Sequence, residues 1–103
     1  MNKAIAVSAL GDKRGALALY DQAVAIRERL VNQEGRHELA GELAQSVGYR
    51  GSALIALGEK ARGIEDMCSA ENVLTVEIAH KGRADLQQTL TWIRQRLKTE
   101  HPN

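Results

Sequence analysis

Histidine, cysteine and carboxylate side chains are the residues of this chain that could perform catalysis or bind a metal. The three histidines share no helical face at the spacing of metal ligands; they are His37, His80 and His101. Cys68 completes no Cys/His set, and the adjacent Glu65 and Asp66 are typical of a solvated helix surface. No residues are predicted to converge in a catalytic pocket. The sequence therefore predicts no enzyme activity, no metal site and no cofactor.

Charge and composition narrow the classes of partner. Fourteen Lys and Arg balance 13 Asp and Glu, giving a net charge of +1, so no excess charge favours nucleic acid or anionic lipid. The first ten residues match neither a signal peptide nor a membrane anchor. Cys68 is the only cysteine, which favours the reducing cytoplasm, and we expect it to be a small core residue. The expected partners are proteins or peptides, without nucleic acid or membrane.

Apolar residues recur at steps of three and four, which is typical of amphipathic helices. We predict five helical stretches, the first a short helix from about Asn2 to Leu10 and the second capped by Asp12. The turns between them are predicted near Gly11, Gly35, Gly58 and Gly82. Gly48 and Gly51 lie inside the third stretch, where each costs about 1 kcal/mol relative to Ala. We therefore expect a neighbouring helix to approach closely there.

The chain aligns with itself at an offset of 47 residues. Leu10-Gly11-Asp12-Lys13 aligns with Leu57-Gly58-Glu59-Lys60, and Gly35-Arg36 aligns with Gly82-Arg83. Two glycine turns recurring at one offset, with apolar positions in step between them, indicate a repeated helical hairpin. Repeat proteins of this kind usually bind partners.

The repeated unit resembles the tetratricopeptide repeat. Its second helix is matched by Gly11-Asp12, Ala16-Leu17, Tyr20 and Ala23-Val24, and less closely by Gly58-Glu59, Gly63-Ile64, Met67 and Ala70; its first helix is matched by Gly51, Ala53 and Leu54. The spacing exceeds the usual repeat of about 34 residues, so the helices are similar to the elongated repeats of kinesin light chains. The resemblance implies an all-α fold of antiparallel hairpins stacked as a short right-handed solenoid of about five helices. It implies one domain over residues 1–103, with a half repeat at 1–35, a full hairpin at 36–82 and a terminal helix at 83–99.

The resemblance also implies a binding groove, because the first helices of successive repeats line the concave face in this family. The groove positions are Met1, Ile5, Ser8, Gln45, Gly48, Tyr49, Ser52, Ile55, Trp92, Gln95, Arg96 and Thr99. The Lys and Asn residues with which some members clamp a peptide carboxylate are absent, which favours an extended segment or a helix as the ligand. Tyr49 and Trp92 have an alternative role in packing between helices, and Tyr20 is expected in the core.

Two alternatives stay open for parts of this surface. Arg94, Arg96 and Lys98 either receive an acidic partner or simply complement the dipole at a helix C-terminus. Besides a protein interaction scaffold, the chain could be a self-associating structural protein or a fragment of a larger signalling protein. In the self-associating case a homodimer forms through an apolar stripe that the terminal helix leaves partly uncovered, made of Leu86, Leu90, Ile93 and Leu97.

Overall fold

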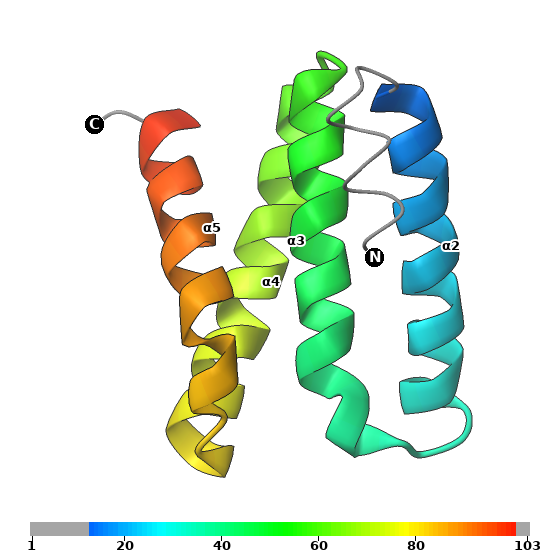
Figure 1. Cartoon of the computed structure of the whole chain (residues 1–103), viewed down its shortest axis with the longest axis vertical. Coiled ribbons are helices and arrows are strands. Elements are labelled where there is room, and N and C mark those ends of the chain that lie inside the picture. Colours follow the sequence, from blue (N-terminus) through cyan, green and yellow to red (C-terminus); the bar gives the residue numbers. More distant parts are fainter. Residues whose placement is uncertain (1–12, 101–103) are drawn as a thin grey trace.

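The computed structural model describes residues 13–100, which form an all-α fold (Figure 1). Its helices are α2 (Lys13–Asn32), α3 (Ala40–Ala56), α4 (Lys60–Lys81) and α5 (Gln87–Glu100), and the short 3-10 helices η1 (His37–Leu39) and η2 (Ala84–Leu86) precede α3 and α5. No strand occurs within this range. The all-α prediction is confirmed. The predicted helix Asn2–Leu10, its turn at Gly11, the cap Asp12 and the groove residues Met1, Ile5 and Ser8 lie outside the described residues.

Helix α3 is the centre of the arrangement. It packs against α2 on one side and α4 on the other, and α5 packs against α4. Consecutive helices run in opposite directions, with α2 and α5 at the two edges of the molecule and α3 in front of α4 (Figure 1). Helices α3 and α5 therefore share one face of the described fold (Figure 1).

The turns that lead into α3 and α5 have the same backbone geometry. Arg36 has φ −79° and ψ 64°, and Arg83, 47 positions later, has φ −76° and ψ 67°. The preceding glycines, Gly35 and Gly82, have φ angles of 68° and 66°, in the left-handed region that favours glycine. The repeat in the sequence is thus a repeat of local structure.

Each repeated turn also carries the same ion pair. Arg36 pairs with Glu38, and Arg83 pairs with Asp85. The hydrogen bond from Arg83 lowers the pKa of Asp85 below its ordinary value. Arg83 also donates to Glu42 of α3 at 2.9 Å, so the second turn is fixed to the central helix.

Gly48 and Gly51 lie where α3 meets its neighbours, as the sequence predicted, and Gly63 of α4 lies at the same crossing as Gly51. A Cβ atom on Gly51 would lie 2.7 Å from the backbone oxygen of Gly63 in α4, and one on Gly63 would lie 2.5 Å from the backbone oxygen of Gly51. A Cβ atom on Gly48 would lie 2.8 Å from the Cδ1 atom of Ile93 in α5. The axes of α3 and α4 can approach this closely only because neither helix has a side chain at the crossing.

The core contradicts the predicted dimer surface on the terminal helix. Leu86, Leu90 and Ile93 are 1%, 2% and 0% exposed, and Leu97 packs against the same cluster. This cluster also contains Ala44 of α3 and buried residues of α4, which are Met67, Ala70 and Leu74. The expectation that the apolar stripe of α5 is partly uncovered is therefore wrong, because α5 turns that stripe onto α3 and α4. A second copy cannot reach it without opening the core.

Cys68 also differs from expectation, since its side chain is exposed on α4. Its neighbour Met67 is fully buried and Ala70 is 1% exposed. Each residue turns about 100° around a helix, so the position between these two buried residues is directed away from the core.

Arg50 joins three helices. From α3 it donates two hydrogen bonds to the carboxylate of Asp66 in α4, at 2.8 and 3.0 Å, and its guanidinium also lies 3.6 Å from Asp21 of α2. The bond to Asp66 is the main reason why the pKa of Arg50 is raised. Two parallel bonds from one guanidinium fix the rotation of α3 relative to α4.

Substitution of the glycines distinguishes backbone contact from side-chain contact. Gly63→Ala is expected to lower the free energy of unfolding by about 3 kcal/mol, because its Cβ meets the backbone of α3, which cannot move aside. Gly48→Ala is the matched control: its Cβ meets the flexible end of Ile93, and alanine is the better helix former by about 1 kcal/mol. Urea unfolding followed by circular dichroism measures both. Equal losses for the two variants would contradict the close backbone crossing.

Arg50→Lys is expected to lower the free energy of unfolding by about 1 kcal/mol, because lysine cannot donate the paired bonds to Asp66. Arg62→Lys, at the exposed pair with Glu59, is the control and is expected to change stability by less than about 0.5 kcal/mol. Thermal unfolding at low and high salt compares them. If the two variants are equally stable, Arg50 does not fasten the helices.

Candidate interaction surfaces

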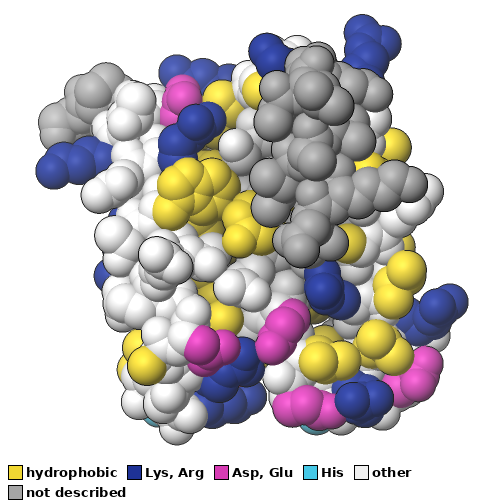
Figure 2. Space-filling view, viewed as in Figure 1, with side chains coloured by type: hydrophobic (Ala, Val, Ile, Leu, Met, Phe, Trp, Pro, Cys, Tyr) yellow, Lys and Arg dark blue, Asp and Glu magenta, His cyan; other side chains and the backbone are white. Residues whose placement is uncertain are grey.

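A row of aromatic rings crosses the face shared by α3 and α5. The ring centroids of Tyr49 in α3 and Trp92 in α5 are 5.6 Å apart, and those of Tyr49 and Tyr20 in α2 are 6.0 Å apart. Tyr20 is 6% exposed, which agrees with its predicted place in the core, whereas Tyr49 and Trp92 are half-buried. Figure 2 shows hydrophobic side chains gathered between α5 and α3. Both predicted roles of Tyr49 and Trp92 are therefore compatible with their positions, since they contact each other and keep exposed edges.

Polar residues accompany the aromatic pair on the same faces of the two helices. Gln45 donates to Thr89 of α5 at 3.0 Å, which ties α3 to α5. Ser52 is half-buried on α3, while Gln95 and Thr99 are exposed on α5, where the Thr99 hydroxyl donates to the Gln95 carbonyl. We name the surface made of Gln45, Tyr49, Ser52, Trp92, Gln95, Arg96 and Thr99 the front face.

Two predicted groove residues lie elsewhere. Ile55 packs against the core, and its Cγ1 atom lies 2.5 Å from where a Cβ on Gly63 would be. Gly48 is buried against Ile93. Ile55 follows Tyr49 by six residues, which places it about a third of a turn away around the helix, toward α4. Neither residue is part of the front face.

Arg96 is the cation of the front face. Its Nε atom is buried without a hydrogen-bond partner, and no carboxylate among residues 13–100 pairs with it. Arg94, by contrast, bonds to Glu71 at 3.1 Å and to Thr75 at 3.2 Å on α4. The basic patch predicted on α5 is thus divided, with Arg94 engaged in packing and Arg96 still able to donate.

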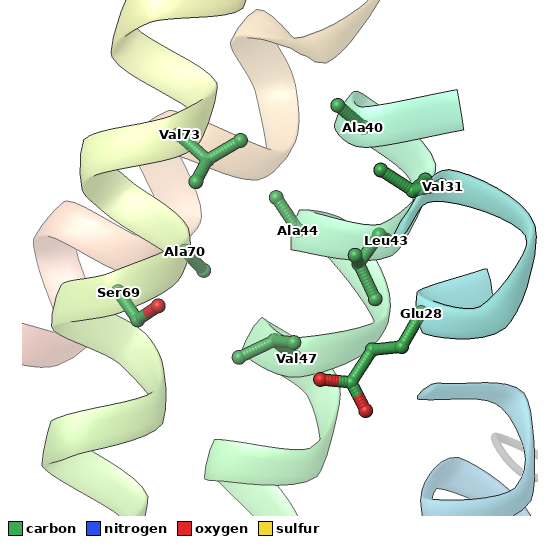
Figure 3. Close-up of a pocket in the computed structure, with 9 residues that line it drawn as sticks. All are labelled: Glu28, Val31, Ala40, Leu43, Ala44, Val47, Ser69, Ala70 and Val73. Carbon is green, nitrogen blue, oxygen red and sulfur yellow. The ribbon is translucent and has the colours of Figure 1, made fainter. Parts of the chain in front are cut away.

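A second hollow surface lies between α2 and α4, where the two helices leave part of α3 uncovered. This groove has a volume of about 280 Å³ (Figure 3). We name it the back groove; its lining is Ala40, Leu43, Ala44 and Val47 from α3, Glu28 and Val31 from α2, and Ser69, Ala70 and Val73 from α4. Glu28 and Ser69 are the polar members of this lining.

Sequence reasoning missed the back groove because every apolar stripe was assigned to the core. A signal was available in Val73 and Leu74. Adjacent residues point about 100° apart on a helix, so the two side chains cannot both face one neighbour. Leu74 is fully buried and Val73 is 38% exposed.

Comparison with known proteins adds no relative: no protein-family model, no curated protein and no solved structure matches the chain. Within residues 13–100 there is no helix with the length and apolar content needed to cross a membrane. The same range contains no group of three or more His, Cys, Asp or Glu side chains placed to hold a metal ion. The two surfaces themselves therefore carry the functional argument.

Tyr20, the buried residue of the aromatic row, predicts that the free energy of unfolding decreases at alkaline pH. Burial, and secondarily Tyr49, raises the pKa of Tyr20 above its ordinary value of 10.0. The folded state therefore favours the neutral phenol, and this stabilisation is complete below pH 10 and is lost as the pH rises through the raised pKa.

Tyr20→Phe is accordingly expected to reduce the fall in unfolding free energy between about pH 9 and pH 11, as measured by urea unfolding. Tyr49→Phe is the control and should retain most of the fall, because burial is the larger cause. A Tyr20→Phe profile parallel to that of the unsubstituted protein would show that the Tyr20 phenol is not the group responsible.

Proposed function

We propose that this protein is a protein interaction module of the tetratricopeptide-repeat type, a short scaffold of stacked helical hairpins that binds a peptide segment of a partner protein across the front face. The observation that carries the proposal is the Tyr49–Trp92 pair, which is half-exposed and bridges two helices, with ring centroids 5.6 Å apart. Aromatic side chains that present a flat apolar surface and keep a polar edge are enriched at binding sites.

The internal repeat supports the choice of this face. At the offset of 47 residues, Gln45, Tyr49 and Ser52 of α3 correspond to Trp92, Arg96 and Thr99 of α5. Both helices follow turns of the same geometry, so equivalent positions are directed the same way. A surface that combines side chains from equivalent positions of successive repeats is the kind on which repeat proteins bind extended partners.

The positive charge of Arg96 on the front face suggests which side chains the bound peptide segment carries. Arg96 is half-buried and pairs with no carboxylate among residues 13–100, so the accessible end of its guanidinium can still form a charge-assisted hydrogen bond with a ligand. We therefore propose a ligand with a carboxylate side chain opposite Arg96 and an apolar or aromatic side chain against Tyr49 and Trp92. Arginine and carboxylate groups form strong, directional pairs.

The test begins with peptides selected from a random 12-residue display library against the purified chain. The selected peptides are expected to combine an acidic residue with an apolar one and to bind with dissociation constants of about 1 to 100 μM. Arg96→Glu is expected to weaken binding at least about tenfold, because it replaces attraction by repulsion.

Lys98→Glu is the matched control, since it makes the same change of charge on the same helix but lies about a third of a turn from Trp92. Fluorescence of Trp92, the only tryptophan, and amide chemical shifts should both report binding at α3 and α5. Selected peptides that bind Arg96→Glu as tightly as the unsubstituted protein, or a library that yields no binder, would refute the proposal.

A further inference from the structure

The back groove is a second apolar surface, on the α2 and α4 side of α3. Its depth comes from small residues, because Ala40, Ala44 and Ala70 leave room for bulkier side chains from outside. Leu43 and Val47 are half-buried on α3, and Val73 is 38% exposed at the α4 edge. The groove therefore offers several apolar side chains to solvent, and it contains no aromatic residue.

The apolar character continues along one edge. Ser69, Val73 and Val76 follow at steps of four and three, so they share one face of α4. Val76 is 51% exposed, more than Val73. Beyond Val73, the groove therefore leads onto further apolar surface.

The opposite end is acidic. Twelve carboxylates lie between residues 13 and 100, and Glu28, Glu34 and Glu65 are the ones that form no salt bridge in this range, although the charge of Glu28 contributes to the raised pKa of Arg50. Figure 3 shows the Glu28 side chain extending from α2 toward the groove, beside Val47. Glu65 precedes Ser69 by four residues, one turn further along the same face of α4. Two of the three unpaired carboxylates thus flank one end of the groove.

We propose that the back groove binds an amphipathic helix of another protein, with a stripe of bulky apolar residues and with Lys or Arg residues at the end that meets Glu28. The lining supplied by α3 repeats at helical spacing, over Ala40, Leu43, Ala44 and Val47, so the ridges of a second helix can lie between these side chains. The cation neutralises Glu28, and the apolar stripe covers Ala44 and Ala70. This binding is independent of the front face.

Designed helical peptides test the proposal. The probe is an 18-residue peptide with a leucine stripe and lysines at one end; one matched peptide replaces the lysines by glutamates, and another replaces the leucines by glutamines. The leucine–lysine peptide is expected to bind with a dissociation constant of about 10 to 100 μM. The glutamate peptide should bind about three- to tenfold more weakly, and the glutamine peptide should not bind.

Variants of the protein localise the binding. Glu28→Lys is expected to reverse the preference, so that the glutamate peptide becomes the tighter ligand, and Val73→Asp is expected to weaken the leucine–lysine peptide at least about tenfold. Matched controls are Glu34→Lys, another unpaired carboxylate, and Ile26→Asp, at an exposed apolar residue of α2 outside the lining. Both should bind as the unsubstituted protein does. All four positions are exposed, and circular dichroism checks that each variant keeps its helices.

Several results would overturn the proposal. The first is that the leucine–lysine peptide does not bind at concentrations up to about 1 mM. The second is that Glu28→Lys leaves the preference between the lysine and glutamate peptides unchanged. The third is that the amide chemical shifts that change on binding map to Tyr49 and Trp92. Light scattering of the protein without peptide gives a fourth such result. If the protein is a dimer and Val73→Asp dissociates it, a second copy of the chain occupies the groove. Failure here leaves the front-face proposal intact, because Arg96→Glu tests that face separately.

Discussion

The crossing of α3 and α4 at Gly51 and Gly63 is the contact on which the other packing depends. Each glycine lies against the backbone oxygen of the other, so no side chain separates the helices at this point. The close crossing sets the distance at which Arg50 reaches Asp66 with two hydrogen bonds. It also holds α4 in the position where α5 packs against it and completes the core. Dispersion forces act between the closely packed backbones at this crossing, and the side chains of Met67 and Ile55 pack beside the two glycines.

Both proposed surfaces arise from the way α2, α4 and α5 are placed around α3. Because α3 and α5 follow equivalent turns, they present equivalent positions on one side of the molecule, and the front face forms there. On the other side, α2 and α4 flank α3 and leave uncovered the part of it that lines the back groove (Figure 3). A compact all-helical chain can thus offer two separate surfaces, one aromatic with a cation and the other aliphatic with unpaired carboxylates.

Much of the fold could be predicted from its glycines. A glycine between two helices usually marks a turn, and a glycine inside a helix usually marks a close contact with a neighbouring helix. The turn glycines and the 47-residue offset predicted the repeated turn, and the cost of Gly48 and Gly51 predicted close packing. What covers an apolar stripe was harder to predict. Leu90 and Ile93 form the same pattern whether or not a neighbouring helix covers them, so the sequence could not reveal that α5 folds onto α3 and α4.

The position of Cys68 and the displacement of Ile55 from the front face depend on rotations of about 100° per residue. These rotations are resolved only when the neighbouring helices are placed. The back groove depends on how far α2 and α4 diverge, which no single residue encodes.

The order of helix contacts has a consequence for how the protein loses its structure. Apart from the contacts of α5 with α3, each helix packs chiefly on its neighbours along the chain, so stability is close to a sum of terms between adjacent helices. Within residues 13–100, Ala16 and Tyr20 of α2 form a small cluster with Ala53 of α3, and Val24 and Val31 of α2 are also buried, whereas α3, α4 and α5 share the larger cluster. Local unfolding should therefore begin at α2, and the amide protons of α3 and α4 should exchange last with solvent. Such graded cooperativity would let the edge helix open and reclose while the three helices behind it stay folded.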